Sequence, residues 1–249
     1  FNGNYTTGAA TNISEATLVL DQKVYCSTKL TSDEKDQGAT VWLPKLMTAT
    51  IEAVLEEVYD YVFSLITTGG ATPSVDQIQK VAVADMDREA VVACGTAATK
   101  AKISKRGRFM VLSADYYGKL FSDTSIVSSL INTGAGSAIT EGMLPPVHRF
   151  KVAEYIGFQN RATPHFVEGI FGSPDAIAIA TALPEVPRRA AGTYTAVTDA
   201  KTGLTVQIRE WSDENTGEDY VAAAILFGAK IVDKNRLFAI VSDTPVTSP

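Results

Sequence analysis

The sequence predicts an α+β fold, because its helical and strand-like patterns are strong and occupy different parts of the chain. Residues 43–66 carry one uninterrupted amphipathic pattern, which predicts a long helix. Residues 108–120 combine a short apolar run with a helix-start signal, which predicts a buried strand followed by a capped helix. From residue 194 onward, strand-like runs alternate with turn residues, which predicts a β-rich C-terminal region.

The N-terminal region predicts an extended arm followed by a hairpin. Residues 1–13 are rich in Asn, Thr and Gly and show no periodic pattern. Residues 14–30 contain two alternating runs with Asp21-Gln22 at the turn position, and both faces carry polar side chains. A hairpin that buries so little of itself protrudes into solvent, packs on a neighbouring subunit or forms a short edge of its own domain's sheet.

Residues 43–66 are expected to form the longest helix of the chain. Their apolar side chains recur every three or four positions, and Pro44 suits the first turn, where a missing N–H costs nothing. Glu52 and Asp60 mark the solvated face, and Gly69-Gly70 ends the helix. At 1.5 Å per residue the helix is ~36 Å long, which predicts a flat or elongated molecule.

A second helix is predicted to begin at residue 74, because Ser74 and Gln77 have the spacing of a capping box. Its apolar side chains continue to Met86, and it either ends near Ala90 or extends to about residue 102. A dense basic run follows, which we expect to form a solvated loop before a strand: Lys100, Lys102, Lys105, Arg106 and Arg108.

The strand predicted at residues 109–112 is followed by Ser113, whose hydroxyl suits a helix N-cap, and by Asp115 in the first turn. The helix after this corner is expected to bury Tyr116 and Leu120. The next elements along the chain are a helix at 124–131 behind Asp123, a loop at 132–138, and strands at 147–155 and 166–171.

Residues 173–183 are predicted to form a helix, with Ser173 as its N-cap and Pro174 at its first position. The C-terminal region then predicts strands throughout, and Gly228 inside the longest of them is interpreted as a bulge. These strands are expected at residues 194–198, 204–211, 220–231 and 237–241, with a turn at 199–203.

The composition and charge of the chain argue against several classes of protein, nucleic-acid readers among them. The chain has 249 residues, of which 45% are apolar, so it can bury a substantial core. Its net charge of −6 argues against a nucleic-acid reader, which usually presents a basic face. Cys26 and Cys94 form no paired motif, so we expect reduced thiols in an intracellular product. We expect no signal peptide and no membrane-spanning run of 18 apolar residues.

The sequence offers few residues for catalysis or metal binding. Gly134-Ala135-Gly136 lacks the third glycine of a dinucleotide-binding loop, and no strand precedes it. His148 and His165 are too few for a familiar zinc site. Cys94 followed by a glycine leaves one alternative, an intracellular hydrolase that uses Cys94 with His148 or His165. A thiol in an Ala- and Val-rich segment is, however, usually a core residue. We therefore expect no enzyme activity and no catalytic, cofactor-binding or metal-binding residues.

The order of these segments resembles the major capsid (coat) proteins of tailed bacteriophages, whose fold is shared with encapsulins. Residues 107–121 (GRFMVLSADYYGKLF) look like the family's R-x-x-V-L-S-x-x-x-Y-x-x-L stretch. Residues 139–155 and 167–187 resemble its return strand and the strand and helix that follow. Residues 203–243 are similar to its closing strands, through Gly203-Leu204 and Phe227-Gly228-Ala229.

The resemblance implies an extended loop hairpin, a long spine helix, a central axial domain and a β-rich peripheral domain. The implied boundaries are an N-terminal arm at 1–13, the hairpin at 14–42, the spine helix at 43–72, the axial domain at 73–187 and peripheral strands at 188–249. The family's usual segment before the hairpin is short or missing here, and nothing matches a motif for the covalent crosslinks that some relatives form.

The function that the resemblance implies is a structural, non-enzymatic shell subunit of a phage or prophage. The chain would assemble with itself into hexamers and pentamers in the host bacterial cytoplasm and reside in the virion. Scaffolding, portal and decoration proteins are further expected partners, and packaged double-stranded DNA would be contacted weakly. An encapsulin-like compartment is the alternative within the fold. The residues expected at subunit contacts are Leu20, Asp21, Gln22, Lys23, Tyr25, Gly134 and Gly136.

Overall fold

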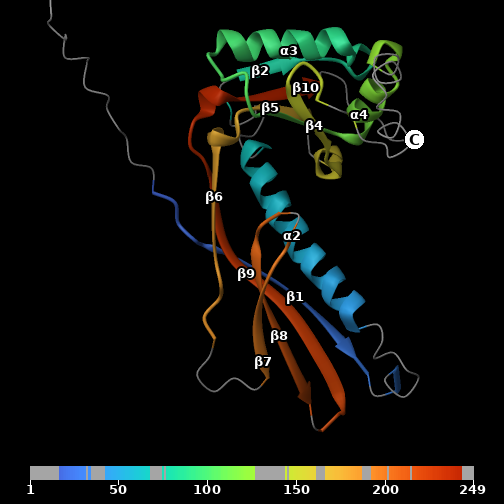
Figure 1. The fold of residues 1–249 in the computed structure, drawn as a ribbon, viewed down its shortest axis with the longest axis vertical. Helices are drawn as coiled ribbons and strands as arrows, with labels where there is room; N and C mark the ends of the chain where they lie inside the picture. Colours follow the sequence, from blue (N-terminus) through green and yellow to red (C-terminus); the bar gives the residue numbers. More distant parts are fainter. Residues whose placement is uncertain are drawn as a thin grey trace, which may run out of the picture.

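Two β-sheets joined by one long helix make up the molecule (Figure 1). The structure is a computed structural model. The residues it describes are 17–31, 33–34, 43–67, 75, 77–126, 144, 146–160, 166–186, 192–200, 202–213 and 215–242.

The first sheet, sheet A, is built around the long strand β9 (Glu218–Ile231). β1 (Gln22–Leu30) pairs antiparallel with one edge of β9. β8 (Thr205–Asp213) and β6 (Ile177–Ala182) pair antiparallel with successive stretches of β9. Because β6 overlaps β1 in its β9 partners, β6 lies on the same side of β9 as β8. β7 (Thr193–Thr198) pairs with β8, so β1 and β7 are edge strands.

The helix α2 (Leu43–Thr67) lies across one face of sheet A (Figure 1). Val54 and Val58 on this helix are fully buried, because the apolar stripe of the helix meets the apolar face of the sheet. The ring of Tyr61 meets that of Phe227 edge-on, with centroids 5.3 Å apart. The buried partners from the sheet are Val206, Ala223, Ile225 and Phe227.

The second sheet, sheet B, has the strand order β2 (Gln77–Lys80), β10 (Leu237–Ser242), β5 (Phe166–Gly172), β3 (Arg108–Leu112) and β4 (Phe150–Glu154). Two helices accompany it, α3 (Arg88–Lys100) and α4 (Ala114–Phe121). Short 3₁₀ turns connect the larger elements: η2 (Val83–Asp85), η3 (Ile156–Asn160), η4 (Pro174–Ala176) and η5 (Lys234–Arg236).

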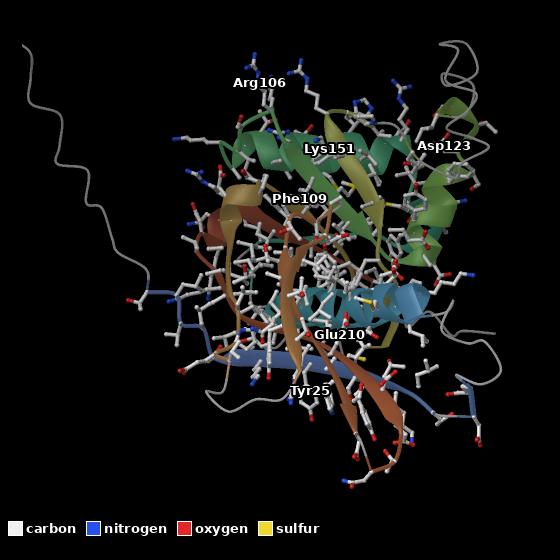
Figure 2. All side chains as sticks on the ribbon, turned by 60° about the horizontal axis from the view of Figure 1, so that its bottom comes forward. Tyr25, Arg106, Phe109, Asp123, Lys151 and Glu210 are labelled. Carbon is white, nitrogen blue, oxygen red and sulfur yellow. The ribbon has the colours of Figure 1, made fainter. Side chains whose placement is uncertain are left out.

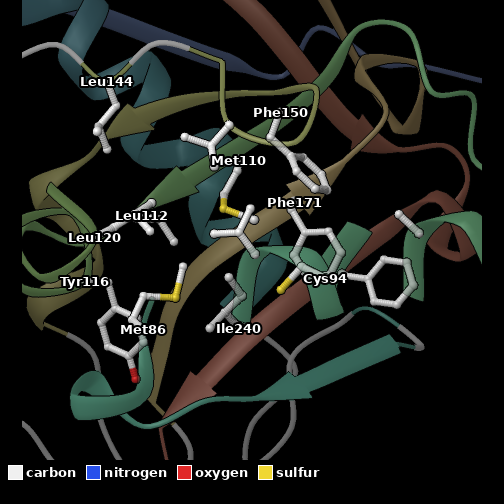
Figure 3. Close-up of a cluster of buried hydrophobic side chains, with 14 of the residues drawn as sticks. Met86, Cys94, Met110, Leu112, Tyr116, Leu120, Leu144, Phe150, Phe171 and Ile240 are labelled. Carbon is white, nitrogen blue, oxygen red and sulfur yellow. The ribbon is translucent and has the colours of Figure 1, made fainter. Parts of the chain in front are cut away.

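The central strands of sheet B are covered on both faces. Met110 and Leu112 of β3 point into the core beneath α3 and α4, together with Cys94 and Tyr116 (Figure 3). The alternate residues of the same sheet enter a second cluster, which receives Ile66 from the end of α2. A sheet buried on both faces needs near-continuous apolar strands, and every residue of β10 is buried.

The C-terminal half of α2 ties the two sheets together. The ring of Phe63 packs on those of Tyr155 and Phe158, with centroids 4.4 and 5.4 Å away. The hydroxyl of Tyr155 donates a hydrogen bond to the carboxylate of Asp60. One helix therefore contributes to the core of sheet A along one part and to that of sheet B at its end.

The predicted hairpin turn at Asp21-Gln22 is wrong. Residues 17–21 form no strand, and Gln22 begins β1, which pairs with β9 instead of with its own neighbours in sequence. The bulge predicted at Gly228 is also wrong, since the β6–β9 register runs through it without interruption. A Cβ at Gly228 would collide with the carbonyl oxygen of Val19, so close approach of this backbone explains the glycine.

Two predicted helices are wrong. Residues 177–182 form strand β6, because their Ala and Ile residues alternate with a period of two and pair with β9. Gln77–Lys80 forms β2, which pairs parallel with β10, so the helix in this region begins at Arg88. Asp87 caps that helix, accepting a 2.9 Å hydrogen bond from the N–H of Ala90.

The strongest predictions are confirmed. α2 and the strand–corner–helix unit β3–α4 lie where the patterns place them, although the hydroxyl of Ser113 makes no capping hydrogen bond. Residues 124–126 are helical, and Asp123 accepts a 2.8 Å hydrogen bond from the N–H of Ser125, while 127–131 lie outside the described residues. The strands predicted at 147–155, 166–171 and in the C-terminal region are present with small shifts of their ends.

Candidate intersubunit surface

Strand β1 presents one face to α2 and the other to solvent. Cys26 is half-buried against the cluster beneath α2, and the hydroxyl of Thr28 lies 3.2 Å from that of Thr50 on the helix. The alternate residues Lys23 and Tyr25 point away from the helix, and 72% of the Tyr25 surface is exposed (Figure 2). Tyr25 is therefore an exposed aromatic side chain on an edge strand, and it indicates an interface only together with neighbouring apolar side chains.

The structure places five of the predicted contact residues in one continuous segment. Leu20 and Asp21 precede β1 and are exposed, and Gln22 begins the strand half-buried. Their role at a subunit contact stays a prediction. Gly134 and Gly136 lie outside the described residues.

Four side chains form a stacked row on the face of sheet A opposite α2. The guanidinium of Arg209 lies 4.4 Å from the ring centroid of Trp211 and 5.5 Å from that of Tyr194. The indole of Trp211 stacks on the ring of Tyr220, with centroids 5.1 Å apart and an interplanar angle of 7°. Cation–π and stacking contacts hold these large side chains against one another on the sheet.

The register places this row and Tyr25 on the same side of sheet A. Tyr25 pairs with Ala224, whose neighbours Ala223 and Ile225 point to α2, so Tyr25 points away from it. Tyr220 and Trp211 are likewise register partners on this side. We call this surface the outer face of sheet A, defined by Tyr25, Tyr194, Arg209, Trp211 and Tyr220.

Beside α2 lies an acidic groove of about 540 Å³. It runs between the helix, the start of η3 and the turn before β8. Its carboxylates are Glu52, Glu56, Asp60, Glu154 and Asp199. Burial, with a contribution from the negative charge of Asp199, raises the pKa of Tyr59 at its rim. The groove therefore favours positively charged groups over anions.

The hydrolase alternative requires a reactive Cys94, and the structure opposes it. The thiol is fully buried in the core beneath α3, and burial raises the pKa of Cys94 to about 12. A nucleophilic cysteine needs a lowered pKa and access to substrate. Cys94 is instead a small core residue. His165 lies outside the described residues.

Two further observations concern the described part of the chain alone. Its His, Cys, Asp and Glu side chains form no group that could hold a metal ion. None of its helices is long and apolar enough to cross a membrane.

Sequence reasoning missed the stacked row. Tyr194 and Arg209 occur in strands that the sequence does predict, but their side chains meet only through the pairing of β7 with β8. The one local signal is that Arg209 and Trp211 are two positions apart in a strand, so both lie on the same face.

No family model matches the sequence, and no curated protein matches it in a sequence search. Solved structures, in contrast, resemble it over nearly its full length. The capsid of the cyanophage P-SCSP1u matches with a TM-score of 0.60 and 10% identity, covering 97% of this chain and 80% of that one. The capsid of Ralstonia phage GP4 matches with a TM-score of 0.57 and 14% identity, covering 93% and 75%.

A virus-like particle from Pyrococcus furiosus also matches, with a TM-score of 0.51 and 13% identity, covering 88% of this chain and 75% of that one. At such identities the likeness establishes the fold. The chain therefore has the α+β fold of phage major capsid proteins, as the sequence resemblance implied.

Proposed function

We propose that this chain is the structural major capsid protein of a tailed phage or prophage, and that it assembles into the hexamers and pentamers of an icosahedral shell around the DNA genome. The observation that carries the proposal is the likeness to phage capsid structures over 93–97% of the chain. A shared fold supports a shared role only by analogy, so the proposal also needs support from the side chains on the surface of this chain.

The stacked row on the outer face of sheet A provides that support. The central strands of sheet B are buried on both faces, whereas α2 packs on one face of sheet A and the stacked row lies on the other. Aromatic and arginine side chains gathered on an open sheet are typical of protein–protein interfaces. Repeated copies could cover this face through one heterologous contact, which closes into rings.

The proposal also names contacts and partners. The segment Leu20, Asp21, Gln22, Lys23 and Tyr25, with Gly134 and Gly136, meets a neighbouring copy. The domain boundaries implied by the resemblance are part of the same proposal. Scaffolding, portal and decoration proteins are the further partners, and the acidic chain contacts packaged DNA weakly. Assembly takes place in the host bacterial cytoplasm, and the product is the virion.

A pair of variants tests the role of the outer face. Tyr25→Glu places a charge on that face, and Ile78→Glu, the control, places one at an exposed apolar position of β2. We expect Tyr25→Glu to reduce the yield of assembled particles at least tenfold while the melting temperature stays unchanged. The control should assemble normally. Equal particle yields from both variants would contradict the assignment of this face to subunit contact.

A cargo-enclosing compartment is the second candidate, favoured by the likeness to the virus-like particle from Pyrococcus furiosus. The two candidates differ in their contents. Particles purified from the native source and treated with nuclease should retain long double-stranded DNA if the shell encloses a genome. Recovery of an enclosed protein without protected DNA would favour the compartment.

A further inference from the structure

A pocket of about 400 Å³ lies between α3 and the turn that leads into β4, and basic side chains gather around it. We call it the basic pocket and define it by Lys100, Lys105, Arg108, His148 and Arg149. No carboxylate from the described residues lines it. Figure 2 shows the neighbouring Arg106 and Lys151 at this end of the molecule, away from Tyr25.

Arg108 forms the floor of the basic pocket. Only 3% of its surface is exposed. Its guanidinium donates to the carbonyl oxygens of Ser104, Gly95 and Ile103 at 2.9, 3.1 and 2.7 Å, and to the hydroxyl of Thr99 at 3.2 Å. Each of these acceptors is neutral, so the hydrogen bonds fix the guanidinium in place, and no carboxylate of the described residues pairs with its charge.

The charge of Arg149 opposes that of Arg108 in the basic pocket. Burial and the positive charge of Arg149 both lower the pKa of Arg108. Lys100, Lys105 and Arg149 form no ion pair within the described part of the chain. Like charges gathered without a carboxylate stabilise the fold poorly, and an anion placed between them would remove the repulsion.

The backbone around the basic pocket is strained. His148 and Arg149 have φ values of 45° and 71°, and Lys102, in the loop after α3, has a φ of 60°. Among the described residues, these three are the non-glycine residues with positive φ. Val147 and Phe150 exchange two backbone hydrogen bonds of 3.1 and 2.8 Å around the His-Arg pair. Such a two-residue turn favours Asn-Gly, so His-Arg costs backbone free energy here.

We propose that the basic pocket binds a phosphate group. Lysine and arginine side chains line it from α3, the loop after α3, β3 and the turn before β4, and so many cations match the charge and the several oxygens of a phosphate better than those of a single carboxylate. The phosphate belongs either to free inorganic phosphate or to the backbone of a nucleic acid. This site is independent of shell assembly, because every residue that forms it comes from one copy of the chain.

A double variant with a charge-matched control tests the site. Lys105→Gln with Arg149→Gln removes two charges from the pocket, whereas Lys119→Gln with Lys234→Gln removes two exposed charges outside its lining. Binding of inorganic phosphate is measured by calorimetry, and that of a short DNA duplex by fluorescence anisotropy at low salt. We expect the pocket variant to lose at least tenfold in affinity and the control to lose less than threefold.

The two ligands separate the sources of the phosphate. If the pocket variant loses affinity for both inorganic phosphate and the DNA duplex, the pocket binds phosphate groups in general. If it loses affinity for the duplex alone, the pocket binds the backbone of a nucleic acid. Equal affinities in the pocket variant and the control would overturn the proposal. A pocket variant that changes self-association in sedimentation, with phosphate affinity unchanged, would overturn it in favour of an acidic surface on a second copy.

A second variant keeps the test independent of folding. His148→Asn with Arg149→Gly installs the residues that the turn favours, so the melting temperature should rise while phosphate affinity falls. If the melting temperature and the phosphate affinity both fall, His148 and Arg149 stabilise the fold, and this result would contradict a binding role.

Discussion

Arg108 shows at the scale of one residue what a local pattern cannot reveal. It ends a basic run that predicts a solvated loop, yet its side chain is buried and donates hydrogen bonds to four neutral acceptors. Those acceptors include Gly95 and Thr99 of α3, and their position depends on how the helix packs. Burial of a charged residue is therefore set by tertiary structure.

Replacing Arg108 should destabilise the protein. Arg108→Met leaves buried carbonyl oxygens without donors, which we expect to lower the free energy of unfolding by about 3 kcal/mol. Arg106→Met, at an exposed position of the same run, should have little effect. Urea denaturation of both variants measures the difference, and equal losses would show that the Arg108 hydrogen bonds contribute nothing.

Glu168 makes the stability of the folded state depend on pH. Only 4% of its surface is exposed, and burial raises the pKa of Glu168 above the ordinary value of 4.5, with a further contribution from Asp115. The folded state thus binds this proton more tightly than the unfolded chain does. Its stabilising contribution is complete below pH 4.5 and is lost as the pH rises through the raised pKa.

Glu168→Gln should therefore raise the melting temperature at pH 7 and remove this part of the pH dependence. The exposed Glu210→Gln serves as the control and should leave the profile unchanged. Melting curves between pH 4 and 8 measure both. A lower melting temperature for Glu168→Gln at pH 7 would show that the charged carboxylate is stabilising.

Cys94 is expected to be unreactive in the folded protein, because burial raises its pKa to about 12. A thiol reagent should label it only after denaturant is added. Rapid labelling of Cys94 under native conditions, followed by peptide mapping to distinguish it from Cys26, would revive the hydrolase alternative.

At the scale of elements, the length of the apolar pattern decides what the sequence can predict. α2 and the β3–α4 corner combine long or consistent periodicity with clear start signals, and both are confirmed. β6 and β2 are short, and pairing with β9 and β10 overrides the local capping signals that suggested helices. β1 pairs with residues from the far end of the chain, which no local turn signal can indicate.

Because Gly228 has no side chain, the segment before β1 can lie against sheet A. Gly228→Ala places a methyl group against the carbonyl of Val19, so residues 17–21 should separate from β9 at a cost of about 2 kcal/mol. Gly118→Ala, in α4 with open space around it, should instead stabilise the helix. Hydrogen exchange and melting temperature report both effects. Unchanged protection of 17–21 in Gly228→Ala would contradict the close approach.

At the scale of the whole molecule, the central strands of sheet B are buried on both faces, whereas Tyr25 on the outer face of sheet A is exposed. The sequence could indicate that Tyr25 and Lys23 share one side of a strand, since this follows from alternation. It could not indicate the row of Tyr194, Arg209, Trp211 and Tyr220, because that row depends on the order of three strands. The outer face they form is where we expect a second copy to bind.

Particle mass tests the central claim, which is that copies of this chain assemble into a shell. Light scattering combined with negative-stain microscopy on the purified protein gives mass and shape together. We predict closed shells, or rings with five or six times the mass of the 26.6 kDa chain. A monodisperse monomer of 26.6 kDa at every concentration, with and without a co-expressed scaffolding protein, would contradict the account.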